Sequence, residues 1–179
     1  MIIEHTKKDL SKILFVVNDA ALKYKGVIPD DCWHEPYMLE NELISEFDNG
    51  VRMFGYRKNN KLVGVMGIHE LKGVTLIRHA YTLTDYQGIG IGKSLLQYLF
   101  EINKNTFLLV GTWRDATWAI MFYEKFGFEL NTKKQTNRLL KRYWNVSSKQ
   151  IANSIVLEKY TPVNKQLNIS AFTRPTQSQ

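Results

Sequence analysis

Disulfide, signal-peptide and membrane-spanning patterns are all missing from this sequence of 179 residues. Its one cysteine, Cys32, excludes an internal disulfide and a cysteine-based metal cluster, and we expect no metal. No apolar run reaches the roughly 18 residues that a membrane-spanning helix needs. The opening residues, MIIEHTKKDL, lack the basic-then-apolar order of a signal peptide. We therefore expect a cytoplasmic protein with no membrane partner.

Acidic residues are fewer than basic ones, 17 against 24, so the formal net charge is +7. This excess suits an anionic ligand or partner. It is concentrated between Asn131 and Leu157, where no acidic residue occurs. The segment is either an ordinary solvated surface or an electropositive rim for phosphates or an acidic acceptor, and nucleic acid is kept as a rival partner. Its cations are Lys133, Lys134, Arg138, Lys141, Arg142 and Lys149.

Composition indicates a single globular domain. Hydrophobic residues make up 44% of the chain and charged residues 23%, which is typical of a folded soluble protein. The chain is too short for two ordinary domains. From Thr161 onward, TPVNKQLNISAFTRPTQSQ has no periodicity and no acidic residue. We expect a domain over residues 1–160 and a flexible tail over residues 161–179.

The first part of the chain is expected to form two helices. Thr6 and Asp9 fit a capping box ahead of an amphipathic helix that ends at Gly26. The sequence VIPDDCWHEPYM then reads as an irregular loop. Within it, Pro36 is placed to begin a second helix, which stops at the Asp-Asn-Gly sequence of residues 48–50.

Three strands should follow as an antiparallel meander. Residues 51–57, 62–69 and 74–83 are rich in β-branched and aromatic side chains, and Asn-Asn and Lys-Gly turns separate them. Residues 106–111 are almost wholly apolar, which is typical of a central strand buried on both faces. The sheet is therefore expected to combine a meander with a later central strand.

Helices alternate with the later strands. Apolar residues recur at helical spacing over residues 91–102. Asp115 or Thr117 can cap a further helix, for which Gly127 is the expected left-handed end. The remaining predicted elements are a strand from residue 128 to 130, a short basic helix over 137–144 and a final strand over 154–160.

The sequence GIGIGKS lies between the third predicted strand and a helix. A glycine-rich turn at a helix N-terminus is a site for an anion, since its N–H groups are unpaired and the helix dipole favours negative charge. A Walker A loop would need glycine in place of Gln87, and a dinucleotide fingerprint would need it in place of Lys93 or Leu95. Both nucleotide interpretations are therefore excluded.

The spacing that fits is Q-x-x-G-x-G, formed by Gln87, Gly90 and Gly92. Together with the downstream sequence ATWAIMFYEKFGF, this loop resembles the GNAT superfamily of acyl-CoA-dependent N-acyltransferases, and the resemblance spans residues 2–160. Ala116 departs from the asparagine of many members. The resemblance implies an α/β (α+β) fold, a mixed and mostly antiparallel twisted sheet flanked by helices in the order ααβββαβα, followed by terminal strands.

The resemblance implies acetyl-CoA (coenzyme A) as the acyl donor. In members of the family the loop amides bind the CoA pyrophosphate, and the end of the preceding strand pairs with the pantetheine arm. One strand amide polarises the thioester carbonyl. The alternative for Lys93 is that its side chain does not contact phosphate and is simply solvated on the helix surface. The implied cofactor-binding residues are Ala80, Tyr81, Thr82, Gln87, Gly88, Ile89, Gly90, Ile91, Gly92, Lys93 and Ser94.

Two residues are candidates for acid–base catalysis. Tyr123 matches the family tyrosine that protonates the departing CoA thiolate, although it also lies on the apolar helical face and could be a core residue. His79, on the predicted central strand, has a side chain suited to removing a proton from the acceptor amine. The alternatives are that His79 is simply packed, or that Glu70 at the end of the neighbouring strand is the base.

The acceptor site is the least determined part. In members of the family the loop between the first two helices forms part of the wall of this site. The candidate acceptor contacts are therefore His34, Glu35 and Tyr37. Helix capping or loop packing is the alternative for each of them.

These observations predict an acetyl-CoA-dependent N-acetyltransferase that passes an acetyl group directly to a primary amine. We expect the acceptor to be a small molecule or a peptide, and the protein to be a monomer or a homodimer. A non-catalytic CoA-binding or sensor module on the same fold is the first rival. A nucleic-acid-binding protein that uses the basic segment is the second, although that segment carries no recognised nucleic-acid motif.

Overall fold

A computed structural model describes residues 1–162 of the chain. The predicted tail, apart from its first two residues, lies outside the described residues. The strands are β1 (Ile2–His5), β2 (Arg52–Lys58), β3 (Lys61–Leu71), β4 (Val74–Thr82), β5 (Phe107–Trp113), β6 (Glu129–Leu130) and β7 (Ser154–Tyr160). The α-helices are α1 (Leu10–Ala21), α2 (Glu40–Asp48), α3 (Ile91–Ile102), α4 (Thr117–Glu124), α5 (Lys133–Tyr143) and α6 (Ser148–Asn153).

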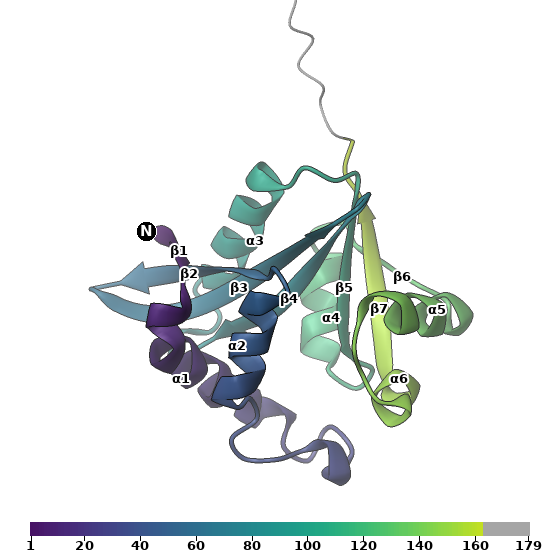
Figure 1. Ribbon diagram of the computed structural model, residues 1–179, viewed down its shortest axis with the longest axis horizontal. Coiled ribbons are helices and arrows are strands. Elements are labelled where there is room, and N and C mark those ends of the chain that lie inside the picture. Colours follow the sequence, from purple (N-terminus) through teal and green to yellow (C-terminus); the bar gives the residue numbers. More distant parts are fainter. Residues whose placement is uncertain (163–179) are drawn as a thin grey trace, which may run out of the picture.

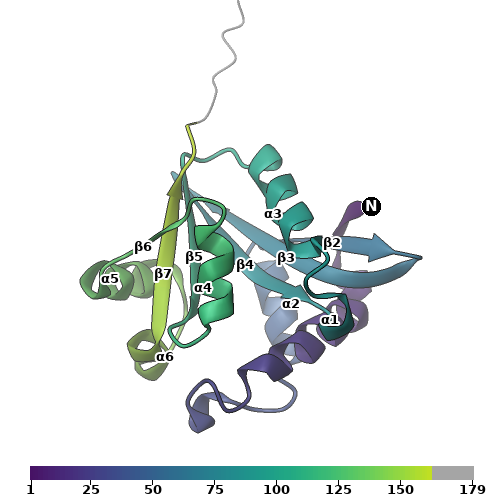
Figure 2. The same ribbon diagram turned by 180° about the vertical axis from the view of Figure 1, so that it is seen from behind.

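Within residues 1–162, seven strands form one sheet in the order β1-β2-β3-β4-β5-β7-β6. Among these described strands only the β4–β5 pair is parallel, so the predicted mixed and mostly antiparallel sheet is confirmed. Helices α3 and α4 cover one face of the sheet, and α1, α2, α5 and α6 cover the other (Figures 1 and 2). This layering allows the sheet to bury apolar side chains on both of its faces.

The main core is formed between the sheet and helices α1 and α3. Val17 on α1, Leu96 on α3 and Met53 on β2 are each fully buried there. A smaller cluster lies beneath α5, where Leu140 packs against Leu76 and other residues of the central strands. The apolar spacing of residues 91–102 therefore marks a genuine core face, as the sequence predicts.

The meander and most later elements lie where the sequence predicts them, but several boundaries were wrong. Helix α1 ends at Ala21, well before Gly26, and a short 3-10 turn follows it. Helix α2 begins at Glu40 and not at Pro36. The reason is that Asn18 of α1 holds Met38 through two hydrogen bonds of 2.8 and 3.1 Å, which keeps the preceding residues in the loop.

Two predictions of N-terminal caps can also be compared with the structure. The capping box of Thr6 and Asp9 is present, but it begins a 3-10 turn directly ahead of α1. Helix α4 begins after Ala116, so neither predicted cap is used. Sequence reasoning missed β1, the early start of α5 and all of α6. The last two begin at capping boxes of the form T-x-x-Q and S-x-x-Q, a signal that was present in the sequence.

Candidate active site

The candidate site begins where the parallel pairing of β4 and β5 stops. The strands are paired from Val74 with Phe107 to Ile77 with Val110, yet both continue well beyond that point. Past Ile77 the two strands diverge (Figure 1). A cleft of about 570 Å³ lies along this divergence. The cleft exposes backbone N–H and C=O groups of β4 that the sheet does not use.

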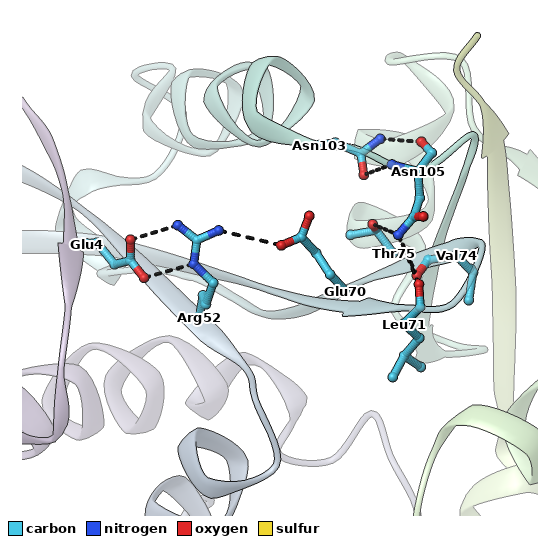
Figure 3. Close-up of polar contacts among 8 residues, drawn as sticks. All are labelled: Glu4, Arg52, Glu70, Leu71, Val74, Thr75, Asn103 and Asn105. Atoms are coloured by element: carbon cyan, nitrogen blue, oxygen red, sulfur yellow. Dashed lines mark hydrogen bonds and ion pairs between the residues drawn. The ribbon is translucent and has the colours of Figure 1, made fainter. Parts of the chain in front are cut away.

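Asn105 fixes the closed end of this divergence. Its side-chain amide donates to the carbonyls of Leu71 and Val74 at 3.1 Å and to Thr75 Oγ1 at 3.0 Å. Asn103 in turn donates to the Asn105 carbonyl at 2.6 Å (Figure 3). This network ties the start of β5 to the β3–β4 turn, so the two strands are clamped at one end and open at the other.

A β-bulge in β4 lies on the wall of the cleft. Val65 pairs with Tyr81 and Gly67 with Arg78, which leaves Met66 opposite both His79 and Ala80. His79 has a φ of +50°. A bulge breaks the alternation of side chains along a strand and redirects the residue at which it occurs. The strained backbone therefore lies at His79, which is also the residue predicted to be the catalytic base.

The glycine loop forms the open end of the cleft. Gly88 and Gly90 have φ values of +77° and +89°, which only glycine adopts without strain. A side chain at either position would meet no atom within 4 Å, so both face open space. Gly90 is the N-cap of α3 and provides no side-chain cap. The first N–H groups of α3 are therefore available to an anionic ligand.

Most of the predicted cofactor-binding residues line the cleft. Ile89 and Ser94 are the exceptions. Ile89 is 56% exposed, and the Ser94 hydroxyl donates to the Gly90 carbonyl at 3.1 Å within the first turn of α3. Gln87 donates through Nε2 to the Thr82 carbonyl at 3.1 Å, which holds the loop against the end of β4. The predicted residues on the cleft wall are Ala80, Tyr81, Thr82, Gln87, Gly88, Gly90, Ile91, Gly92 and Lys93.

Tyr123 on α4 lies on the opposite wall of the cleft and is only 4% exposed. It is at once a core residue and a cleft residue, because its ring packs edge-on against Phe122 and Phe128. Burial, and to a smaller extent the nearby Tyr24, raises the pKa of the Tyr123 hydroxyl above its ordinary value. Its phenol is therefore protonated at neutral pH and able to donate a hydrogen bond.

Ala116 is fully buried next to Ile28 and Trp113, at the position where many family members have asparagine. It contributes packing at the start of α4 and leaves the N-cap without a side-chain bond. The departure from the family pattern therefore changes a capping position, and Ala116 does not line the cleft as the structure describes it.

The predicted acceptor residues do not line the cleft. Glu35 forms an exposed ion pair with Lys25 at 2.7 Å, and His34 Nδ1 lies 2.6 Å from the Pro36 carbonyl. Tyr37 lies one layer behind the wall. Its ring stacks on Tyr24 with a centroid separation of 5.7 Å, and its hydroxyl accepts a hydrogen bond from Trp113.

Sequence reasoning missed two residues, one that lines the cleft and one that contacts a cleft residue from outside it. Tyr24, in the turn after α1, lines it, and burial raises its pKa above the ordinary value. Glu46 on α2 contacts His79, with 2.7 Å between Oε2 and Nε2. Neither residue belongs to a local sequence motif, so no sequence signal marked them.

Two other groups of charged residues lie away from the cleft. Glu70 faces Arg52 at 3.6 Å, and Arg52 also holds Glu4 through two bonds (Figure 3). Glu70 does not line the cleft, in contrast to His79. None of the cations of the basic segment lines the cleft within the described residues. The lysines that do are Lys23, Lys93 and Lys125.

The buried tyrosines make stability sensitive to alkaline pH. The pKa values of Tyr24, Tyr81 and Tyr123 are all raised, chiefly by burial. Above about pH 10 the unfolded chain releases phenol protons that the folded chain retains, so the free energy of unfolding falls as pH rises. Below about pH 10 both states are protonated and this contribution is constant.

We expect the double variant Tyr24→Phe/Tyr123→Phe to lose less stability than wild type between pH 9 and pH 11. Urea unfolding across this range measures the slope. Tyr160→Phe is the matched control, because Tyr160 is 63% exposed and should leave the slope unchanged. Equal slopes for all three proteins would contradict the assigned burial.

Comparison with known proteins agrees with this geometry. Residues 49–130 match the family model described as "Acetyltransferase (GNAT) domain". These residues contain the meander, the glycine loop and helix α4. No curated protein sequence matches the chain. Within the described residues, no group of three potential metal-ligating side chains is found and no helix is long and apolar enough to cross a membrane.

Solved structures share the fold at low sequence identity. The PaiA N-acetyltransferase of Thermoplasma acidophilum, in complex with coenzyme A, is 18% identical with a TM-score of 0.69, covering 90% of this chain and 98% of that one. The ribosomal-protein-S18-alanine N-acetyltransferase of Escherichia coli is 16% identical with a TM-score of 0.67, covering 96% and 99%. A GNAT-family acetyltransferase of Elizabethkingia anophelis with acetyl-CoA bound is 19% identical with a TM-score of 0.60, covering 90% and 97%. The match of residues 49–130 to a GNAT acetyltransferase domain, together with the fold shared with solved N-acetyltransferases, supports placing the chain in the GNAT superfamily of acyltransferases.

Proposed function

We propose that this protein moves an acetyl group from acetyl-CoA directly to a primary amine. The observation that carries the proposal is the continuous cleft between the diverging strands β4 and β5. It runs from the glycine loop at its open end to Tyr123 on its wall, so a long thioester donor with phosphates at one end fits its chemistry. Acetyl-CoA has this arrangement of groups, and solved relatives of the same fold bind CoA or acetyl-CoA.

The phosphates would bind at the glycine loop. Gly88 and Gly90 leave space for close approach of the backbone, and the N-terminus of α3 favours negative charge. Lys93 and Lys125 line the same cleft and add positive charge. We assign the pyrophosphate to the N–H groups between Gly88 and Lys93.

The unpaired edge of β4 would hold the rest of the donor. Ala80, Tyr81 and Thr82 lie past the end of the β4–β5 pairing, and those of their backbone groups that do not bond to β3 or to the Gln87 side chain would bond with the pantetheine arm. One N–H there would stabilise the oxyanion that forms when the amine attacks the thioester carbon. A preorganised donor of this kind typically contributes about 3–4 kcal/mol to the transition state.

Collapse of the tetrahedral intermediate breaks the carbon–sulfur bond, and the departing thiolate needs a proton. Tyr123 is the proposed donor, because its neutral phenol lies on the cleft wall. Burial disfavours a thiolate as well as a phenolate, so the same environment raises the proton affinity of both groups. His79 is the proposed base that removes a proton from the attacking amine.

The acceptor is proposed as a small molecule or a peptide with a free primary amine. Structures of the same fold include an enzyme named for ribosomal protein S18 alanine and an enzyme named PaiA N-acetyltransferase, so the fold alone does not select one acceptor class. The aromatic residues Tyr24, Tyr81 and Trp118 line the cleft and favour an acceptor with apolar surface next to the amine. A cytoplasmic location and a monomeric or homodimeric state stay predictions.

The loop assignment is tested with Gly90→Asp. A carboxylate at this position would face the pyrophosphate, and aspartate is strained at a φ of +89°, so we expect CoA affinity to fall at least about a hundredfold in isothermal titration calorimetry. Gly73→Asp is the matched control. Gly73 has a φ of +80° and open space around it, but it lies in the β3–β4 turn. Unchanged CoA affinity in Gly90→Asp would refute the site.

The role of Tyr123 is tested with Tyr123→Phe. We expect kcat for acetyl transfer to fall about a hundredfold, within the usual range for loss of a general acid, while the affinity for acetyl-CoA changes less than about twofold. Tyr143→Phe, the same change on α5, should retain wild-type values. Wild-type turnover in Tyr123→Phe would reduce Tyr123 to a core residue. Transfer assays across a panel of amines also separate this enzyme from a non-catalytic CoA-binding module.

A further inference from the structure

The bulge in β4 brings two consecutive side chains to a single carboxylate. Neighbouring residues of a regular strand point to opposite faces of the sheet. Arg78 and His79 nevertheless both contact Glu46, which lies on α2. The φ of +50° at His79 redirects its side chain and makes this convergence possible. The bulge thus determines what His79 touches.

The three side chains form a compact and mostly buried cluster. His79 Nε2 lies 2.7 Å from Glu46 Oε2, and Arg78 lies 2.7 Å from the same carboxylate. The side chains of His79, Arg78 and Glu46 are 13%, 16% and 20% exposed. Bonds to a charged group in such surroundings are shorter and stronger than bonds at the surface.

Glu46 is ionised at neutral pH. Burial acts to raise the pKa of its carboxyl, but the hydrogen bond from His79 and the charges of His79, Arg78 and His69 outweigh it and lower that pKa below the usual range. An ionised carboxylate can only accept a hydrogen bond. The Nε2 atom of His79 must therefore carry the proton in this contact. In the neutral ring that leaves Nδ1 as the atom with a free lone pair.

We propose that Glu46 is a positioning residue that prepares His79 to act as the general base through Nδ1. The proposal rests on the proposed acetyltransferase function, because it explains how the general base of that reaction is held in the active tautomer. His79 lines the cleft, while Glu46 does not and so acts through His79. The arrangement resembles other catalytic histidines, in which a carboxylate fixes the tautomer and stabilises the imidazolium that forms.

Proton transfer in this scheme involves His79, Tyr123 and water. The attacking amine gives one proton to Nδ1 of His79 as its nitrogen bonds to the thioester carbon. The proton on Nε2 stays shared with Glu46, and the imidazolium later releases the acquired proton to water. Arg78 offsets the charge of Glu46, so the carboxylate is not left unpaired in its buried position when the ring is neutral. The departing thiolate receives its proton from Tyr123, and the resulting phenolate takes up a proton from water, which matches the proton that the imidazolium releases.

A purely structural role is the competing explanation, because Glu46 also ties α2 to the centre of the sheet. Loss of such a tie would lower stability and change activity only through folding. It would not alter the pH dependence of turnover. The charged and titratable groups that face Glu46 are Arg78 and His79 from β4 and His69 from β3.

The test combines kinetics on Glu46→Gln with acetyl-CoA and a panel of primary amines. Glutamine keeps the shape but loses the charge that stabilises the imidazolium, so we expect kcat to fall about tenfold to a hundredfold. In the pH profile of kcat/KM, the fall in activity at acidic pH (the acid limb) should also move to lower pH. The affinity for CoA should stay at the wild-type value. In a His79→Ala background, Glu46→Gln should cost nothing further. Glu40→Gln, an exposed change on the same helix, is the matched control.

A second measurement does not depend on turnover. Long-range ¹H–¹⁵N NMR spectra of the imidazole rings report the tautomer, and His79→Ala identifies the His79 signals among the four histidines. We expect the Nε2–H tautomer in wild type and a mixture of tautomers in Glu46→Ala. An Nδ1–H tautomer in wild type, or wild-type turnover and an unmoved acid limb in Glu46→Gln, would overturn the proposal. Absence of acetyl transfer by wild type would instead refute the proposed function, and the tautomer measurement distinguishes the two.

Discussion

The parallel pairing of β4 with β5 ends at Ile77 and Val110, and the site depends on that interruption. Two strands paired along their full length would use their own backbone groups and leave no room between them. Here Asn105 clamps one end and the strands diverge at the other. The sheet thereby exposes a strand edge inside the protein, and Tyr123 closes the far wall from α4.

The β-bulge at His79 is the second way in which β4 shapes the candidate site. The strand offers backbone groups on one side, and the bulge turns His79 and Arg78 toward Glu46 on α2. One short segment therefore connects the glycine loop, the proposed oxyanion site and the proposed base. The cost of a non-glycine residue at positive φ is about 1 kcal/mol or more, and the short bonds to Glu46 offset it.

Sequence reasoning predicted what depends on local spacing and missed what depends on distant partners. The spacing of Gln87, Gly90 and Gly92 singled out the glycine loop, and the motif around Tyr123 singled out a residue that lines the same cleft, because both signals lie within a few residues. The register shift at His79 arises from pairing with β3 and has no local signature. Glu46 lies 33 residues away from His79, and only the packing of α2 on the sheet brings them together. The loop predicted to wall the acceptor site instead packs behind the aromatic wall of the cleft.

A crystal structure with CoA bound would show whether the cleft between β4 and β5 holds the acyl donor. We expect the pyrophosphate on the N–H groups between Gly88 and Lys93, the pantetheine arm along Ala80 to Thr82, and the sulfur within hydrogen-bond distance of the Tyr123 hydroxyl. CoA bound elsewhere, such as on the basic surface of α5, would contradict this expectation. So would a sulfur far from Tyr123 with the strands β4 and β5 closed against each other.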